Sequence, residues 1–426
     1  MRLRATARFG LFALLGLMIS WLVACGSGQP SATAPADGSQ EVEFWTMQLQ
    51  PDFTDYFNGL IADYEAQNPG TTVRWVDVPW ADMQSKILTA VTAGTAPDVV
   101  NLNPDFAAQL ASRNAWMPLD DKISAEAKQV YLPNIWQANT LNGQSFGIPW
   151  YLTTNVTLHN QALLDEAGVE PPTTYAELAK VARQVKDATG KYAFFTTFVP
   201  EDSADVLQSF VQMGVPLVDD QGQAAFDTAA GRAVFQYWTD LYQRSLLPRE
   251  VLTQGHRRAI ELFQAGEVAL LSTGAEFFPT IEANAPDIAA VTGSGPQITG
   301  DTGKTNVAVM NLVIPAATDV PEAAVDFALY LTNDANQLSF AQAANVLPST
   351  AGALEDGYFA VEGTRGVEKA RSVSAEQMNQ AEVLIPAMDG IKELQAIVYD
   401  NLQAAMLGQK TVDQAVSDAA AAWNSR

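Results

Sequence analysis

Strand and helix patterns alternate along the first part of the chain, and this alternation restricts the fold more than any other feature of the sequence. The segment "EVEFWTMQLQ" alternates apolar and polar residues between Val42 and Thr46, which predicts a strand. The next segment, "DFTDYFNGLIADYEAQNPG", has apolar residues at helical spacing and ends at Pro69-Gly70, so it predicts a helix. A strand pattern in "TTVRWVDV", a helix pattern around residues 83–92 and a strand pattern in "APDVVNLNP" follow. Because this order is typical of parallel sheets with crossover helices, the sequence predicts the α/β class.

The same order of patterns begins again after the strand-like stretch "GQSFGIPWYLTTNVTLHN". Thr174 is suited to an N-cap and Glu177 follows three residues later, which predicts a helix that opens with a capping box. A hairpin turning at Gly222, a long helix in "AAGRAVFQYWTDLYQRS" and a helix that stops at Gly266 before a strand come next. These patterns predict a second α/β segment.

The N-terminus has the pattern of an export signal. Three arginines in the first eight residues precede a mostly apolar run from Phe9 to Val23, which is too short for a stable membrane span. The sequence Leu22-Val23-Ala24-Cys25 resembles a bacterial lipobox, so we interpret residues 1–24 as a signal peptide and Cys25 as the lipidated first residue of the mature chain. The alternative is an ordinary secreted protein that is cut near Ala24. Cys25 is the only cysteine, so no internal disulfide is expected.

Residues 25–40 have the composition of a flexible tether. Gly, Ser, Pro, Ala and Gln dominate and Asp37 is the only charge, so the segment has little to bury. With its lipid, Cys25 would hold a folded body that starts near Glu41 at a membrane surface. No later apolar run approaches the length of a membrane span. The predicted location is therefore outside the cell, lipid-anchored to the outer face of the cell membrane, periplasmic or at the cell surface.

The charge and motif content argues against several functions. With 24 Lys and Arg against 48 Asp and Glu, the formal net charge is −24, which repels nucleic acid and anionic lipid headgroups. The two histidines, His159 and His256, lack metal-ligand spacing, and "GDTGKT" has Ile298 upstream where a phosphate loop requires glycine. No motif selects an acidic pair for glycoside hydrolysis. We therefore expect no enzyme activity, no cofactor and no metal site.

Further segments follow one another in a recognisable order. They are "FNGLIADYEAQNPGTTVRW", "TAGTAPDVV", "LHNQALLDEAGVEPPTTYAEL", "LFQAGEVALLSTGAEF", "VMNLVIPAATDVPEAAVDFALYLT" and "ANVLPST". In this order they resemble the solute-binding proteins of bacterial ABC sugar importers, the family that includes maltose-binding protein. The likeness extends from Glu41 nearly to the C-terminus. It implies a two-lobed periplasmic-binding-protein-like α/β fold, with hinge crossovers and a ligand cleft between lobes that close.

The resemblance also implies where the chain passes between lobes. The expected crossings lie near residues 148–155, 272–274 and 314–324. The expected first lobe is 41–150 plus 273–315, and the expected second lobe is 155–270 plus 320–426.

Polar and aromatic residues stand beyond the carboxyl ends of the predicted strands, where ligands collect in open α/β sheets. Gln48 follows the first strand, Trp80 follows the second, and Asn103 and Asp105 follow the third. A sugar requires hydrogen-bonding partners for its hydroxyls and aromatic rings for its C–H faces, and these residues supply both. The alternatives are a solvated loop for Gln48, packing under the loop for Trp80 and a helix cap for Asp105.

The resemblance adds three pairs of ligand-binding candidates. They are Trp150 and Tyr151, Glu201 and Asp202, and Glu276 and Phe277. The first pair lies on the first crossover, where the family contacts ligand, although hinge packing would also explain it. The second pair would face the cleft from the second lobe or lie in a short surface loop. The third pair stands where the family often has a stacking tryptophan, and "GAEFF" departs from that pattern, which leaves the phenylalanine as the candidate platform.

Together these features predict a substrate-binding lipoprotein of an ABC importer. It would capture a mono- or oligosaccharide between closing lobes and deliver it to membrane permease subunits, with ATP hydrolysis in separate subunits. A monomer is expected. The alternatives are the same fold binding a polyol or compatible solute, glycerol phosphate or a polyamine, a carbohydrate-active enzyme, and a purely structural surface lipoprotein.

Overall fold

The computed structural model describes residues 39–426 except 201, 361–365, 386–387 and 389, and for residues 104 and 105 it describes the backbone alone. Residues 40–426 form one compact unit. The predicted signal peptide, Cys25 and the tether up to residue 38 lie outside the described residues. Within the described ranges, no helix combines the length and the apolar character that a bilayer span requires.

In the part of the chain that the structure describes, one connected sheet of nine strands forms the framework. In pairing order its main path is β10 (Leu347–Pro348), β6 (Ile148–Asn160), β9 (Thr305–Val313), β3 (Val99–Leu102), β1 (Gln40–Met47) and β2 (Thr71–Val78). Off this path, β11 (Ala381–Glu382) pairs with β9. Both β7 (Leu270–Gly274) and β8 (Thr292–Gly295) pair with β6. A separate two-stranded ribbon consists of β4 (Thr140–Leu141) and β5 (Gln144–Ser145). β1 is parallel to β2 and β3, which confirms the predicted parallel sheet, whereas β9 runs antiparallel to β3 and β6.

Helices connect and cover these strands. The longer ones are α1 (Thr54–Gln67), α2 (Trp80–Ala93), α3 (Pro104–Ala111), α7 (Tyr175–Thr189), α8 (Asp205–Gln212), α9 (Ala229–Gln243), α10 (His256–Gln264), α13 (Pro321–Leu331), α14 (Asp334–Ala344), α16 (Gly366–Glu376), α17 (Ile391–Met406) and α18 (Val412–Asn424). The shorter ones are α4 (Ala125–Lys128), α5 (Pro133–Ala138), α6 (Gln161–Ala167), α11 (Phe278–Asn284), α12 (Pro286–Ala290), α15 (Ala351–Leu354), and the 3-10 turns η1 (Arg249–Leu252), η2 (Ala275–Phe277) and η3 (Gln377–Asn379).

Local signals of the sequence are confirmed where they depend on neighbouring residues. α1 buries Phe57 together with the other apolar residues of its predicted stripe. Thr174 and Glu177 form the predicted capping box at the start of α7. The predicted hairpin turns at Gly222, whose φ of 75° suits glycine, between the bridged residues Val218 and Ala224.

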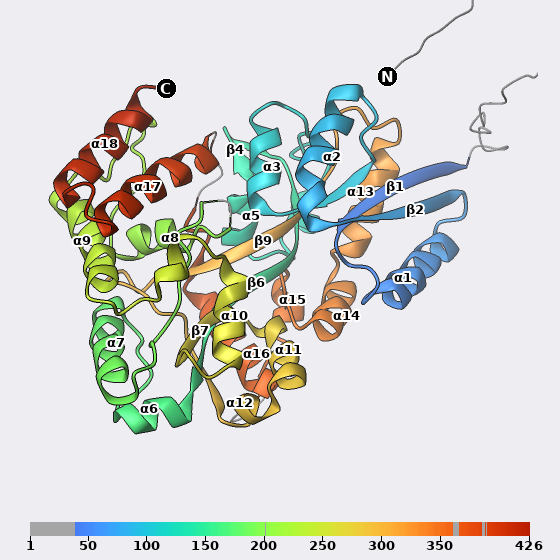
Figure 1. The fold of residues 1–426 in the computed structure, drawn as a ribbon. Helices are drawn as coiled ribbons and strands as arrows, with labels where there is room; N and C mark the ends of the chain where they lie inside the picture. Colours follow the sequence, from blue (N-terminus) through green and yellow to red (C-terminus); the bar gives the residue numbers. More distant parts are fainter. Residues whose placement is uncertain (1–38, 201, 361–365, 386–387, 389) are drawn as a thin grey trace, which may run out of the picture. The chain divides into compact units, whose positions relative to one another are not determined.

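The buried apolar side chains form separate cores, and β6 contributes to more than one of them. Leu152 belongs to the core that contains the buried residues of β1, α1 and α13 (the first core). Val156 and Leu158 belong to the core formed mainly by α7, α9, α17 and α18 (the second core). A smaller cluster, with Met83 and Phe146, packs β1 and β3 against α2 and α3. In Figure 1, β6 and β9 accordingly run between the helices around β1 and β2 and those around β7.

The cores divide the chain differently from the lobes that the resemblance implies. Phe327 of α13 and Phe340 of α14 lie in the first core, although residues 320–426 were expected in the second lobe. The reason is aromatic packing: the ring of Phe327 meets that of Phe44 on β1 edge-to-face, with 5.3 Å between centroids. Phe278, expected in the first lobe, lies in the second core instead. We therefore propose a first lobe built from residues 40–152, 307–359 and 378–381 and a second built from residues 156–289, 370–373 and 391–423, as the two main cores indicate.

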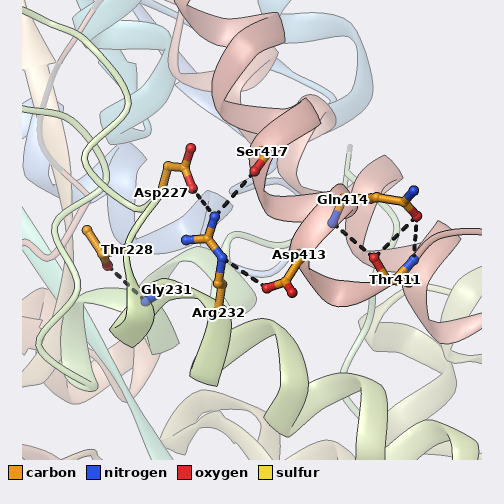
Figure 2. Close-up of polar contacts among 8 residues, drawn as sticks. All are labelled: Asp227, Thr228, Gly231, Arg232, Thr411, Asp413, Gln414 and Ser417. Atoms are coloured by element: carbon orange, nitrogen blue, oxygen red, sulfur yellow. Dashed lines mark hydrogen bonds and ion pairs between the residues drawn. The ribbon is translucent and has the colours of Figure 1, made fainter.

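Surface polar contacts tie the last helix to the second core. Arg232 of α9 donates to Asp227, Asp413 and Ser417, the last two on α18, as Figure 2 shows. Thr411 and Gln414 form a second capping box at the start of α18. Because these ion pairs are partly exposed, they orient the two helices more than they stabilise them.

Candidate functional site

A cavity of about 430 Å³ has walls from elements that pack on different cores; we call it the Trp80 cavity. One wall consists of Trp80, Gln84, Asn103 and Phe106, from the N-terminal turns of α2 and from the start of α3. The other wall consists of Pro200, Asp202 and Ala204, from the loop before α8, and of Lys392 and Ala396, from α17. Its volume lies in the range of about 300–1,000 Å³ that is usual for small-molecule sites.

The first wall is positioned by the end of β1. Gln48 follows β1 with a φ of 52°, and its backbone N–H donates to the Val78 carbonyl oxygen at 2.9 Å. Its side-chain Oε1 accepts from the backbone N–H of Trp80 at 3.3 Å, which caps the first turn of α2. The indole of Trp80 is 47% exposed, a large exposed fraction for an aromatic ring. Gln48 thus supports Trp80, and Trp80 presents an open ring face to the cavity.

The side chain of Asn103 caps a helix with its carbonyl oxygen and leaves its amide nitrogen without a partner in the described part of the chain. As the N-cap of α3, its Oδ1 accepts from the backbone N–H of Phe106 at 2.9 Å. The Nδ2 group has no hydrogen-bond partner among the described residues, so it stays available as a donor. Asp105 lies in the first turn of α3, and its side chain is outside what the structure describes, so its predicted role stays a prediction.

The second wall is held in place by tertiary hydrogen bonds. Asp202 accepts from the backbone N–H of His256 at 2.7 Å, so it caps α10 from a distant part of the sequence. Gln395 of α17 donates to the carbonyl oxygens of Pro200 and Ser203, at 2.7 and 2.6 Å. The hydroxyl of Tyr399 donates to the Ser203 carbonyl at 2.7 Å. Both α17 side chains are buried, so the loop has a fixed support. Glu201 lies outside the described residues, and its predicted role is untested.

A smaller cavity of about 70 Å³ has both apolar residues, such as Phe194 and Trp238, and polar residues in its lining; we call it the Asp205 cavity. Asn155, Gln208, Gln212 and His256 line it together with Asp205. Burial raises the pKa of the Asp205 carboxyl, and the neighbouring His256 acts in the opposite direction. Its volume suits a few water molecules rather than a sugar ring.

A third group consists of Tyr151, Glu276 and Phe277, and it adjoins the Asp205 cavity through the contact of Phe277 with His256. The phenol of Tyr151 has a raised pKa, first because it is buried and then because the Glu276 carboxylate is close. The carboxyl of Glu276 folds back over Gly274, where an added Cβ would overlap it. Phe277 is 37% exposed, and its ring centroid lies 6.1 Å from that of His256. None of the three lines the Trp80 cavity, so their predicted contact with ligand stays a prediction.

Trp150 is buried in the first core. Its side chain is 1% exposed and stacks on the ring of Phe340, with centroids 5.1 Å apart and 21° between planes. The rings of Phe44 and Phe57 also contact it. Sequence order predicted a crossover at Trp150, and β6 is covered on both sides there, so this tryptophan packs within the first core. Its predicted contact with ligand stays a prediction.

Several residues at these cavities carry no signal in the sequence. Gln395 and Tyr399 occupy ordinary buried positions of an amphipathic helix. His256 is one of two histidines, and its link to Asp202 spans 54 residues, so spacing does not reveal it. Over the described ranges, no group of three or more His, Cys, Asp and Glu side chains is close enough to hold a metal ion.

Glu276 is expected to make stability depend on pH. Burial raises the pKa of its carboxyl from 4.5 to about 7, so the folded state favours the protonated form. This contribution to the free energy of unfolding is full below about pH 4.5 and is lost as pH rises through about 7. Glu276→Gln should therefore remove part of the decline in melting temperature between pH 5 and pH 8. The exposed Glu282→Gln on α11 is the control, and equal pH slopes in wild type and Glu276→Gln would contradict the assignment.

This arrangement is that of a binding protein, with a ligand-sized cavity between separate cores and an exposed ring on one wall. The family model for bacterial extracellular solute-binding proteins matches residues 50–338, so the chain belongs to that family. The fold is the two-lobed α/β fold of periplasmic sugar-binding proteins, as the resemblance predicted.

Individual relatives agree with this assignment. A candidate oligosaccharide periplasmic-binding protein from Synechococcus sp. MITs9220, solved with zinc and without it, is 47% identical, with a TM-score of 0.85 over 90% of this chain and 98% of that one. The cyclic alpha-maltosyl-1,6-maltose binding protein of Arthrobacter globiformis is 21% identical, with a TM-score of 0.78 over 91% and 99%. The arabinooligosaccharide-binding protein of Halalkalibacterium halodurans is 26% identical over 310 residues, 69% of this chain and 67% of that protein.

Proposed function

We propose that the protein captures a sugar between the two walls of the Trp80 cavity, as the substrate-binding component of an ABC importer. The observation that carries the proposal is the combination of an exposed indole with Asn103 and Asp202 around one cavity of about 430 Å³. The ring offers a face for sugar C–H groups, while the amide and the carboxylate offer a donor and acceptors for hydroxyls.

We expect the cavity to close on a ligand because its two walls belong to different parts of the fold. Each wall belongs to elements that pack on a different core, so a ligand that contacts both favours the arrangement in which the cores approach. The loaded form would then deliver its sugar to permease subunits, whose ATPase partners are separate chains. Membership of the solute-binding family supports a binding role for the chain, and we propose that the protein acts without catalysis.

The proposal includes the location of the protein. The lipobox-like sequence around Cys25 would provide a lipid anchor, and residues 26–40 would let the folded body reach the permease. The similarity to arabinooligosaccharide-, maltotriose- and lactose-binding proteins favours an oligosaccharide as cargo.

A ligand panel tests the function. The purified protein is titrated with arabinooligosaccharides, maltotriose, lactose, spermidine and glycerol 3-phosphate, and the melting temperature and tryptophan fluorescence are followed. A cognate ligand at 100 times its Kd should stabilise the folded state by about 2.7 kcal/mol. At least one sugar is expected to do this in a saturable manner. Stabilisation by spermidine or glycerol 3-phosphate and by no sugar would contradict the sugar assignment.

A further inference from the structure

A third cavity, of about 470 Å³, lies next to α16; we call it the Thr305 cavity. Its lining comes from the segment before α7, from β8 and the chain that leads to β9, and from α16 and η3. It shares no lining residue with the Trp80 cavity. Its volume is within the usual range of small-molecule sites and far above that needed for one water molecule.

Two hydroxyl groups in this lining lack partners. The Oγ1 atom of Thr305 and the Oγ atom of Ser294 are buried and have no hydrogen-bond partner among the described residues. The Thr305 side chain is 5% exposed. Leaving a buried hydroxyl unpaired costs about 1–3 kcal/mol, so such groups call for an occupant that hydrogen-bonds to them.

The rest of the lining is polar and close to neutral. Thr173, Thr174 and Thr299 bring hydroxyl groups, and no aromatic ring lines the cavity within the described residues. Lys369 and Glu376 bring one charge of each sign, so the cavity does not favour a strongly anionic or cationic occupant. Hydroxyl and amide groups without net charge match a solute that is itself rich in hydroxyls.

Part of this lining is already fixed in place. The Gln377 side chain accepts from the backbone N–H of Gln297 at 2.7 Å and donates to the carbonyl oxygen of Asn155 on β6 at 3.3 Å. The Gln297 Oε1 atom accepts from the backbone N–H of Asn306 at 2.6 Å. An occupant would therefore meet a prearranged set of groups, which lowers the entropy cost of binding.

We propose that the Thr305 cavity is a second binding site, separate from the sugar cleft, for a small neutral polyhydroxyl solute of up to monosaccharide size. Thr305 and Ser294 donate hydrogen bonds to its oxygens, and Gln380 borders the exposed side. Gln297 lines both this cavity and the Asp205 cavity, and Asn155 links the two through Gln377. Occupancy therefore acts on β6, the strand that contributes to both main cores.

Equilibrium dialysis with radiolabelled erythritol and glucose tests the site in four full-length proteins. They are the wild type, Trp80→Ala, Thr305→Val and Gln380→Trp. Trp80→Ala should retain saturable binding of at least one probe. Thr305→Val, which keeps the shape and removes the hydroxyl, should weaken that binding about 5- to 10-fold, and Gln380→Trp should abolish it by filling the exposed side.

Other outcomes separate the alternatives. If Trp80→Ala abolishes binding of the probes, while Thr305→Val and Gln380→Trp leave it unchanged, the second site is overturned. The probes would then bind in the Trp80 cavity alone. No saturable binding in any protein, with Thr305→Val more stable than wild type, would mean that the cavity holds water only. Sugar binding in the Trp80 cavity is judged separately by the oligosaccharide panel, so failure of either proposal is recognisable on its own.

Discussion

Trp80→Ala is expected to weaken binding of the cognate sugar about 10- to 100-fold while the melting temperature stays close to that of the wild type. The indole is 47% exposed in the free protein, so removing it takes little apolar contact from the folded state. A sugar that stacks on this ring buries the exposed face, and the loss of that contact corresponds to about 1.4–2.8 kcal/mol of binding free energy. Isothermal titration calorimetry of both proteins measures the difference.

A matched control separates this effect from a general loss of surface apolar area. Leu407, which follows α17, is 51% exposed and lines none of the three cavities described above. Leu407→Ala should change neither affinity nor stability beyond the scatter of surface substitutions, about 0.5 kcal/mol. Wild-type affinity in Trp80→Ala would show that the ring is not part of the binding surface.

Trp150→Ala is expected to have the opposite profile, with a loss of about 3–5 kcal/mol in the free energy of unfolding. The side chain is 1% exposed, and it packs against Phe44, Phe57 and Phe340, so truncation leaves a cavity in the first core. Urea unfolding followed by circular dichroism measures the loss. Ligand affinity per folded molecule should fall much less than in Trp80→Ala.

The conservative variant Trp150→Phe is the second protein to measure, because Trp150→Ala can be too poorly folded for a binding assay. It keeps an aromatic ring against Phe340 and should lose less stability than Trp150→Ala. Full stability in Trp150→Ala would contradict the core assignment. A stable Trp150→Phe protein with binding abolished would show that this tryptophan contacts ligand after all.

The sequence predicted those parts of the molecule that depend on short-range patterns. The parallel pairing of β1 with β2 and β3 followed from the alternation of strand and helix signals. Trp80 and Asn103 were predicted as ligand contacts because residues after parallel strands meet at one edge of a sheet. Both line the same cavity, and their contact with ligand stays a prediction. Asp202 came from the resemblance, and it lies on the opposite wall.

Other parts depend on contacts that no local pattern records. Trp150 and Tyr151 are neighbours on a strand that is covered on both sides, so periodicity does not tell which one fills the core. The expected lobes followed chain order, whereas Phe327 packs on Phe44 and Phe340 packs on Phe57, residues that lie far away in the sequence. The support of the second wall by Gln395 and Tyr399 depends on bonds to backbone carbonyls, which any sequence at residues 200–203 would offer.

The continuity of β6 has a consequence for cooperativity. Leu152 anchors this strand in one core and Val156 anchors it in the other, only a short distance along the same backbone. Because both halves share this strand, unfolding of one half removes support from the other, so we expect the free energies of unfolding of the two halves to be coupled. A solute-binding protein that closes as proposed above would then resist proteolysis of its interior during each opening, because neither half would unfold alone.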